Sequence, residues 1–277
     1  MVTKLKDICS KNVDSIFDNL VKEELIHRES DFFIKSKGCV FNECFYYLYP
    51  LAEFLDTSPT VDFFLYNSYL HAYAHFLDQS LDSLENSPST KVRSFQISTY
   101  LLLNYLEWVT KEFNSKIKTM FYNYYKENTN YVIDEKKWKF PQCYISKYSS
   151  TRNIHKKAYL LLFPLELYST SKKVFILKKL FINYFSFTLL ADDIFDLDFD
   201  ISHRCLTYPI SIYFKLKHAL PHDQTELMSI KFQIVKTLKN FLHNIGQLEE
   251  DIGQHSVIIN ERISQIRNGL SKRGIEL

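Results

Sequence analysis

Residues 181–200 read FINYFSFTLLADDIFDLDFD, an apolar stretch that ends in a cluster of aspartates. The apolar residues recur at helical spacing and lack the strict alternation of a strand. Five aspartates lie within nine residues, and Asp192, Asp196 and Asp200 are spaced by four, with Asp193 beside them. These carboxylates therefore share one helical stripe. Like charges at this spacing destabilise a helix unless they are neutralised, which favours a bound cation.

The same spacing extends through the rest of the chain and predicts an all-α protein. The 277 residues include only 5 glycines and 7 prolines, too few for a turn-dense β protein, whereas 23 phenylalanines and 19 tyrosines suit a packed core. No repeat or linker divides the sequence, so residues 1–277 are interpreted as a single domain. Residues 127–150 are polar and aperiodic and predict a loop or lid. The expected helices cover residues 2–28, 40–56, 60–86, 89–127, 152–170, 172–201, 207–219, 223–252 and 255–272.

The composition limits which partners the protein is expected to bind and in which cellular compartment it is expected to occur. The formal net charge is +2 and no block of like charges occurs, which argues against nucleic acid and against a polybasic lipid contact. Asp, Lys or Asn interrupts each apolar run, so we expect no integral membrane segment. The five cysteines form no CxxC pair, and the N-terminus lacks the apolar core of a signal peptide. We therefore expect a cytoplasmic protein, with a homodimer left open.

A second acidic site lies near the end of the helix expected over residues 60–86. His71, His75, Asp78 and Asp82 are separated by four, three and four residues, which places them on one helical face. Two carboxylates one turn apart can hold a hard divalent cation. The two histidines are interpreted as hydrogen-bonded core residues.

Ligands that are all oxygen favour Mg²⁺, which takes one or two carboxylates per ion and completes its shell with water and phosphate oxygens. Two acidic helix faces across a bundle would hold more than one Mg²⁺ and would grip a diphosphate. Asp78, Asp82, Asp192 and Asp196 are the predicted catalytic residues. The predicted metal ligands are Asp78, Asp82, Asp192, Asp193, Asp196 and Asp200.

A diphosphate also requires cationic side chains. Arg152 and Lys156 share a face at the start of an apolar helix, and Arg204 lies one turn beyond the last aspartate. These three are the predicted diphosphate-binding residues. Glu249 and Arg262, near the C-terminus, are interpreted as ordinary solvated helix charges.

Two motifs carry a family resemblance. Residues 189–196, LLADDIFD, resemble the DDxxD signature of the class I isoprenoid (terpene) synthases, and residues 78–82, DQSLD, resemble the DxxxD form of their first aspartate motif. Residues 203–209 are similar to the segment that follows the second aspartates of squalene and phytoene synthases. The resemblance implies a helical bundle with a central active-site cavity. It also implies a Mg²⁺-dependent lyase of isoprenoid biosynthesis that ionises an allylic prenyl diphosphate, releases pyrophosphate, and cyclises or rearranges the carbocation.

Other functions remain as alternatives. Residues 36–39, SKGC, do not supply the Gly-Lys-Arg-x-Arg segment of chain-elongating prenyltransferases, which leaves a head-to-head, squalene-type condensing enzyme as the second choice. A di-iron bundle would need paired Glu-x-x-His motifs, and only Glu24 and His27 have that spacing. A non-catalytic helical scaffold would leave the aspartates in apolar helices unexplained.

Overall fold

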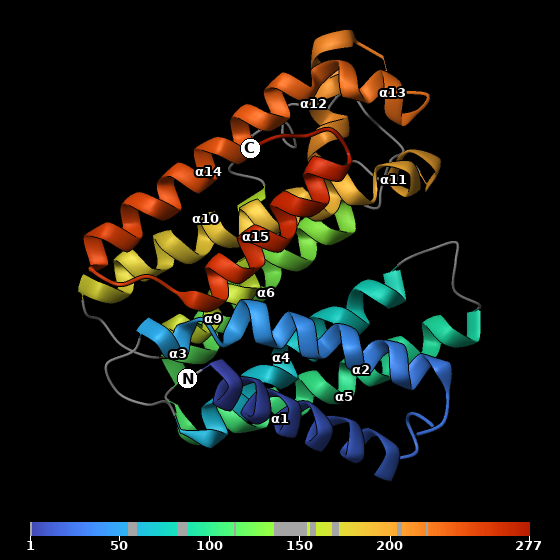
Figure 1. Cartoon of the computed structure of the whole chain (residues 1–277). Coiled ribbons are helices and arrows are strands. Elements are labelled where there is room, and N and C mark those ends of the chain that lie inside the picture. Colours follow the sequence, from blue (N-terminus) through green and yellow to red (C-terminus); the bar gives the residue numbers. More distant parts are fainter. Residues whose placement is uncertain are drawn as a thin grey trace. The chain divides into compact units, whose positions relative to one another are not determined.

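The computed structural model describes residues 2–54, 60–81, 88–113, 115–135, 154–155, 159–167, 172–203, 207–219 and 221–277. Throughout these ranges the secondary structure is helical and contains no strand (Figure 1), which confirms the all-α prediction. The contacts within the chain define two compact units. Unit 1 comprises residues 1–120 and 256–259, and unit 2 comprises residues 121–255 and 260–277. The interpretation of the chain as one domain stays a prediction.

Unit 1 is built mainly from α4 and α5, which pack along their lengths. Asn67 links them, because its amide donates to the Phe63 carbonyl at 2.7 Å while the Tyr105 hydroxyl donates to its side-chain oxygen at 3.2 Å. Tyr105 is fully buried, so this polar pair lies within the core. The elements are α1 (Val2–Lys22), α2 (Asp31–Glu43), the π-helix η1 (Cys44–Leu48), α3 (Leu51–Phe54), α4 (Val61–Leu81) and α5 (Pro88–Glu112).

Unit 2 is organised around α10, whose most extensive partner is α14. Glu166 joins three of its helices, because its carboxylate accepts from the Tyr124 hydroxyl and lies 2.5 Å from the Lys178 ammonium. The first residues of α6 and of α15 are grouped with unit 1. The elements are α6 (Ser115–Glu135), α9 (Tyr159–Glu166), α10 (Lys172–Phe195), α11 (Leu197–His203), α12 (Tyr208–Lys217), α13 (Gln224–Leu227), the 3₁₀-helix η2 (Met228–Ile230), α14 (Lys231–Ile252) and α15 (Val257–Lys272).

α10 contains a longer apolar run than the sequence analysis predicted. Residues 173–195 are long and apolar enough to cross a membrane, with a mean hydropathy of 1.5 over an 18-residue window. Within that window 61% is buried inside the protein. A buried core helix of a soluble protein passes the same test of length and composition, so this single helix is weak evidence for a membrane segment. No other helix in the described ranges is long and apolar enough to cross a membrane.

Several helix boundaries differ from the prediction, among them the start of α2 and the break between α5 and α6. The helix expected from residue 40 begins at Asp31, because the Ser30 side chain accepts a hydrogen bond from the Phe33 amide at 3.1 Å and caps the first turn. Gly38, which weakens a helical pattern, is nevertheless inside this helix. The long helix expected over residues 89–127 is divided, since α5 ends at Glu112 and α6 begins at Ser115.

Candidate functional site

The aspartate cluster spans the junction of α10 and α11. Although α10 ends at Phe195, the helical hydrogen-bond pattern continues through the junction. The Asp196 amide donates to the Asp192 carbonyl at 2.9 Å, and the Asp200 amide donates to the Asp196 carbonyl at 2.8 Å. The three aspartates therefore have the i, i+4, i+8 arrangement that their spacing predicts.

Four aspartates of the cluster form two pairs that differ in solvent exposure. The Asp192 side chain is 43% exposed and Asp196 is exposed, so both carboxylates are reachable from solvent. Asp193 and Asp200 are only 7% and 6% exposed. The accessible pair stands on successive helical turns, which suits a cation that needs one or two carboxylates. The role of Asp193 and Asp200 as ligands stays a prediction.

No group of three or more His, Cys, Asp or Glu side chains is placed to hold a metal ion among the residues with described positions. The binding of Mg²⁺ at these carboxylates therefore stays a prediction.

Arg262 of α15 is a cationic side chain close to Asp192 that was not predicted from the sequence. Its Nη2 lies 4.0 Å from Oδ1 of Asp192, and its side chain is only 26% exposed. Arg262 is thus partly buried, and Glu249 is buried, at 3% exposure, with its carboxylate 3.1 Å from Nδ1 of His255. The interpretation of these two residues as ordinary solvated charges is therefore wrong. Both helices must pack together to bring Arg262 to Asp192, and the spacing of residues along one helix does not predict which distant helix packs against it.

Gly269 of α15 and Arg273, the residue after this helix, contact the end of α10. Arg273 donates from Nη1 to the Ile194 carbonyl at 3.1 Å, and its guanidinium lies 5.5 Å from the centre of the Phe195 ring. A cation at the C-terminal end of a helix is favoured by the helix dipole. A Cβ atom added to Gly269 would lie 2.9 Å from the Phe195 ring, so only glycine allows this close approach. The last turn of α10, which carries the aspartates, is thus held by α15.

The second predicted acidic site belongs to α4 in unit 1. Asp78 is exposed there. One turn earlier, His75 places Nδ1 at 3.0 Å from the Glu43 carboxylate and Nε2 at 2.9 Å from the Gln79 amide. The prediction that His75 is hydrogen-bonded is confirmed. Because Asp78 is in unit 1 and Asp192 in unit 2, the opposition of the two acidic faces stays a prediction.

His71 behaves differently from His75. It is fully buried, and neither ring nitrogen has a hydrogen-bond partner among the residues that the structure describes. Its ring stacks on Tyr47 of η1 at a centroid distance of 6.5 Å. Burial lowers the pKa of His71 to about 3. The residue is therefore a neutral core histidine, as predicted, but it lacks the predicted hydrogen bond.

Four predicted site residues lie outside the described ranges: Asp82, Arg152, Lys156 and Arg204. The predicted central cavity is not tested. The predicted loop or lid over residues 127–150 is wrong for residues 127–135, which form the end of α6, and residues 136–150 lie outside the described ranges. The chain matches no protein-family model, no curated protein and no solved structure. The functional conclusion therefore depends on the residues described above.

Proposed function

We propose that this protein is a Mg²⁺-dependent class I terpene synthase that acts on an allylic prenyl diphosphate. Its products would be pyrophosphate and a cyclised or rearranged hydrocarbon or alcohol. The observation that carries the proposal is the accessible pair Asp192 and Asp196, on successive turns at the end of a largely buried apolar helix. Like-charged carboxylates on successive turns repel each other, and Mg²⁺ with a phosphate ligand would neutralise that repulsion.

The residues have distinct proposed roles. Asp192 and Asp196 would hold Mg²⁺, which when bound supplies neutralisation of the charge on the leaving diphosphate. Asp78 and Asp82 are proposed to hold a second group of ions, as the first aspartate motif implies. Arg262 lies beside Asp192 and offers a planar guanidinium that suits phosphate oxygens. Arg152, Lys156 and Arg204 keep their proposed role as further diphosphate ligands.

The buried residues of α10 support a reaction site next to this helix. Phe181, Tyr184, Phe185 and Phe187 are all at most 1% exposed, so the middle of this helix is shielded from water. An ionised prenyl chain must be kept from water until it has rearranged. Aromatic rings also attract positive charge through their faces. A helix with an apolar middle and an acidic C-terminal end would thus suit a substrate with an apolar chain and a diphosphate.

We predict that Arg262→Gln will have opposite effects on the metal and on turnover. Without substrate, loss of the positive charge 4.0 Å from Asp192 should tighten Mg²⁺ binding by up to about fivefold, because a half-exposed pair of this kind is worth at most about 1 kcal/mol. With a prenyl diphosphate, turnover should fall because a phosphate ligand is lost. Titration calorimetry and a pyrophosphate-release assay measure the two effects. Arg267→Gln, at an exposed position of the same helix, is the matched control and should change neither.

The proposed function is tested by incubating the purified protein with C10, C15 and C20 prenyl diphosphates, with Mg²⁺ or with EDTA. Pyrophosphate release and organic-extractable products are followed together. Mg²⁺-dependent pyrophosphate with a cyclic or rearranged product supports the proposal. A longer, coupled chain would instead identify a prenyltransferase or a head-to-head condensing enzyme. If all three substrates survive intact with Mg²⁺ present, the proposal is wrong, and iron analysis of the protein would test the di-iron alternative.

A further inference from the structure

Helix α5 has two apolar faces. One face packs along α4, the only described helix that α5 contacts extensively (Figure 1), and Tyr105 donates a hydrogen bond across that contact. The other face is open to water, because Val92, Phe95 and Leu103 are 59%, 60% and 61% exposed. Large apolar side chains that gather on one exposed face mark a contact surface.

The exposed residues belong to a continuous stripe along α5. Intervals of three, four, three and four residues separate its members, which are Val92, Phe95, Thr99, Leu102 and Leu106. This is the heptad spacing with which two helices pack side by side. Thr99 is exposed and the two leucines are half-buried, so the stripe is accessible over ~21 Å at 1.5 Å per residue. The shape of the stripe therefore suits a second helix that carries an apolar stripe of its own.

The charges beside the stripe favour α5 of a second copy of the chain as that helix. Arg93 and Glu107 are both exposed and are 14 residues apart, which places them on one side of the stripe at its opposite ends. They are separated by ~21 Å along the axis, too far to pair within one helix. In an antiparallel pair of helices centred on Thr99, Arg93 of each copy lies beside Glu107 of the other. A parallel pair would instead bring like charges together.

Glu107 already has a partner within α5, and this partner leaves the second contact possible. Its Oε1 lies 2.6 Å from Nζ of Lys111, and the two side chains are 64% and 69% exposed. An exposed pair of this kind contributes little to stability. A carboxylate has two oxygens and can accept from an ammonium and a guanidinium together. Glu107 can therefore keep Lys111 and also bind Arg93 of a second copy.

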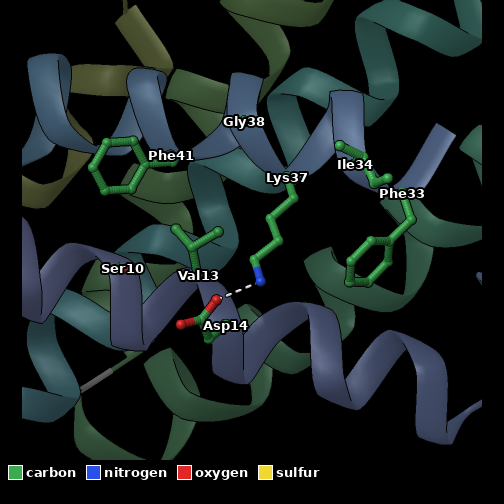
Figure 2. Close-up of a pocket in the computed structure, with 8 residues that line it drawn as sticks. All are labelled: Ser10, Val13, Asp14, Phe33, Ile34, Lys37, Gly38 and Phe41. Atoms are coloured by element: carbon green, nitrogen blue, oxygen red, sulfur yellow. Dashed lines mark ion pairs between the residues drawn. The ribbon is translucent and has the colours of Figure 1, made fainter. Parts of the chain in front are cut away.

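The groove between α1 and α2 offers less to an apolar partner. Figure 2 shows the Lys37 side chain of α2 crossing this groove to Asp14 of α1, where Nζ lies 2.5 Å from Oδ1. Val13 and Phe33 line the groove but are only 1% and 7% exposed. The groove thus presents a closed ion pair and little accessible apolar surface, whereas the stripe on α5 is accessible along its length.

We infer that the protein forms a homodimer in which α5 packs antiparallel against α5 of the partner subunit, about a two-fold axis at Thr99. In this arrangement Val92 lies opposite Leu106 of the partner subunit, and Phe95 lies opposite Leu102 of the partner subunit. Removal of these side chains from water favours association. The inference does not depend on the proposed function, because none of these residues belongs to the proposed reaction site.

Sedimentation equilibrium of the full-length protein over a range of micromolar concentrations tests the inference, and we expect a dimer that dissociates on dilution. Phe95→Glu should raise the dissociation constant about a hundredfold, because an unpaired carboxylate would be buried at each contact. Phe232→Glu is the matched control, since Phe232 is 75% exposed on α14, outside the stripe, and its replacement should leave the dimer unchanged. Both variants change exposed side chains, so their helical circular dichroism should match that of the wild type.

Charge reversal tests the antiparallel arrangement without changing the apolar stripe. Arg93→Glu and Glu107→Arg should each raise the dissociation constant about tenfold, because each opposes like charges at both ends of the contact. The double variant should restore the wild-type dimer, since the reversed charges are again opposite across the two-fold axis. A double variant that dimerises no more tightly than the single variants would overturn the antiparallel arrangement. A wild-type protein that is monomeric at every concentration, or a dimer that Phe95→Glu leaves intact, would overturn the inference as a whole.

Discussion

Asp192→Asn should lower the rate of Mg²⁺-dependent pyrophosphate release about a thousandfold. Asparagine keeps the shape of the side chain but removes the charge from one of the two accessible carboxylates at the end of α10. A metal ion contributes several kcal/mol of charge stabilisation in a reaction of this type, and about 4 kcal/mol corresponds to a factor of a thousand in rate. The pair with Arg262, at 4.0 Å, is partly exposed to solvent, so its loss should lower the free energy of unfolding by less than about 1 kcal/mol.

Asp198→Asn is the matched control for this variant. Asp198 belongs to the same cluster and is exposed, like Asp196, but it is not in the i, i+4, i+8 series that contains Asp192. Its replacement should change the rate by no more than a few fold. Circular dichroism on both variants would verify that the helices are retained. Equal losses in the two variants would show that the cluster acts through its total charge, and full activity of Asp192→Asn would exclude it as a metal ligand.

The helical fold could be predicted because helical periodicity is a local property of the sequence. The helix expected over residues 172–201 covers α10 and part of α11, and the helix expected over residues 223–252 covers α13, η2 and α14. The start of α2 was missed because it is marked by the Ser30 cap and not by the apolar spacing. The break between α5 and α6 was missed because Phe113 continues the apolar pattern across it.

The candidate site could be predicted in part for the same reason. The alignment of Asp192, Asp196 and Asp200 follows from a spacing of four residues, and their backbone hydrogen bonds have that pattern. The burial of Asp200 and the nearby Arg262 depend instead on how distant helices pack. The glycine at position 269 could not be explained from the sequence either, because it is required by the ring of Phe195, which belongs to another helix.

Acid should destabilise the fold through His71, which is fully buried in α4. Burial lowers its pKa from about 6.5 in an unfolded chain to about 3 in the folded protein. Between these values the unfolded state binds one more proton than the folded state, so the free energy of unfolding falls as the pH falls through this window. The contribution of His71 between pH 7 and pH 5 is a loss of about 2 kcal/mol. Chemical denaturation at the two pH values, for the wild type and for His71→Leu, measures it.

His71→Leu should remove that part of the pH dependence. Its stability at pH 7 should not be lower than that of the wild type, because neither imidazole nitrogen has a partner among the described residues and leucine buries no polar group. Ser94→Ala is the control, since Ser94 in the same unit is also buried, its hydroxyl has no partner within the described part of the chain, and it does not titrate. That variant should change stability equally at pH 7 and pH 5. If His71→Leu loses as much stability on acidification as the wild type does, another group causes the loss, and the histidine is already able to accept a proton in the folded state.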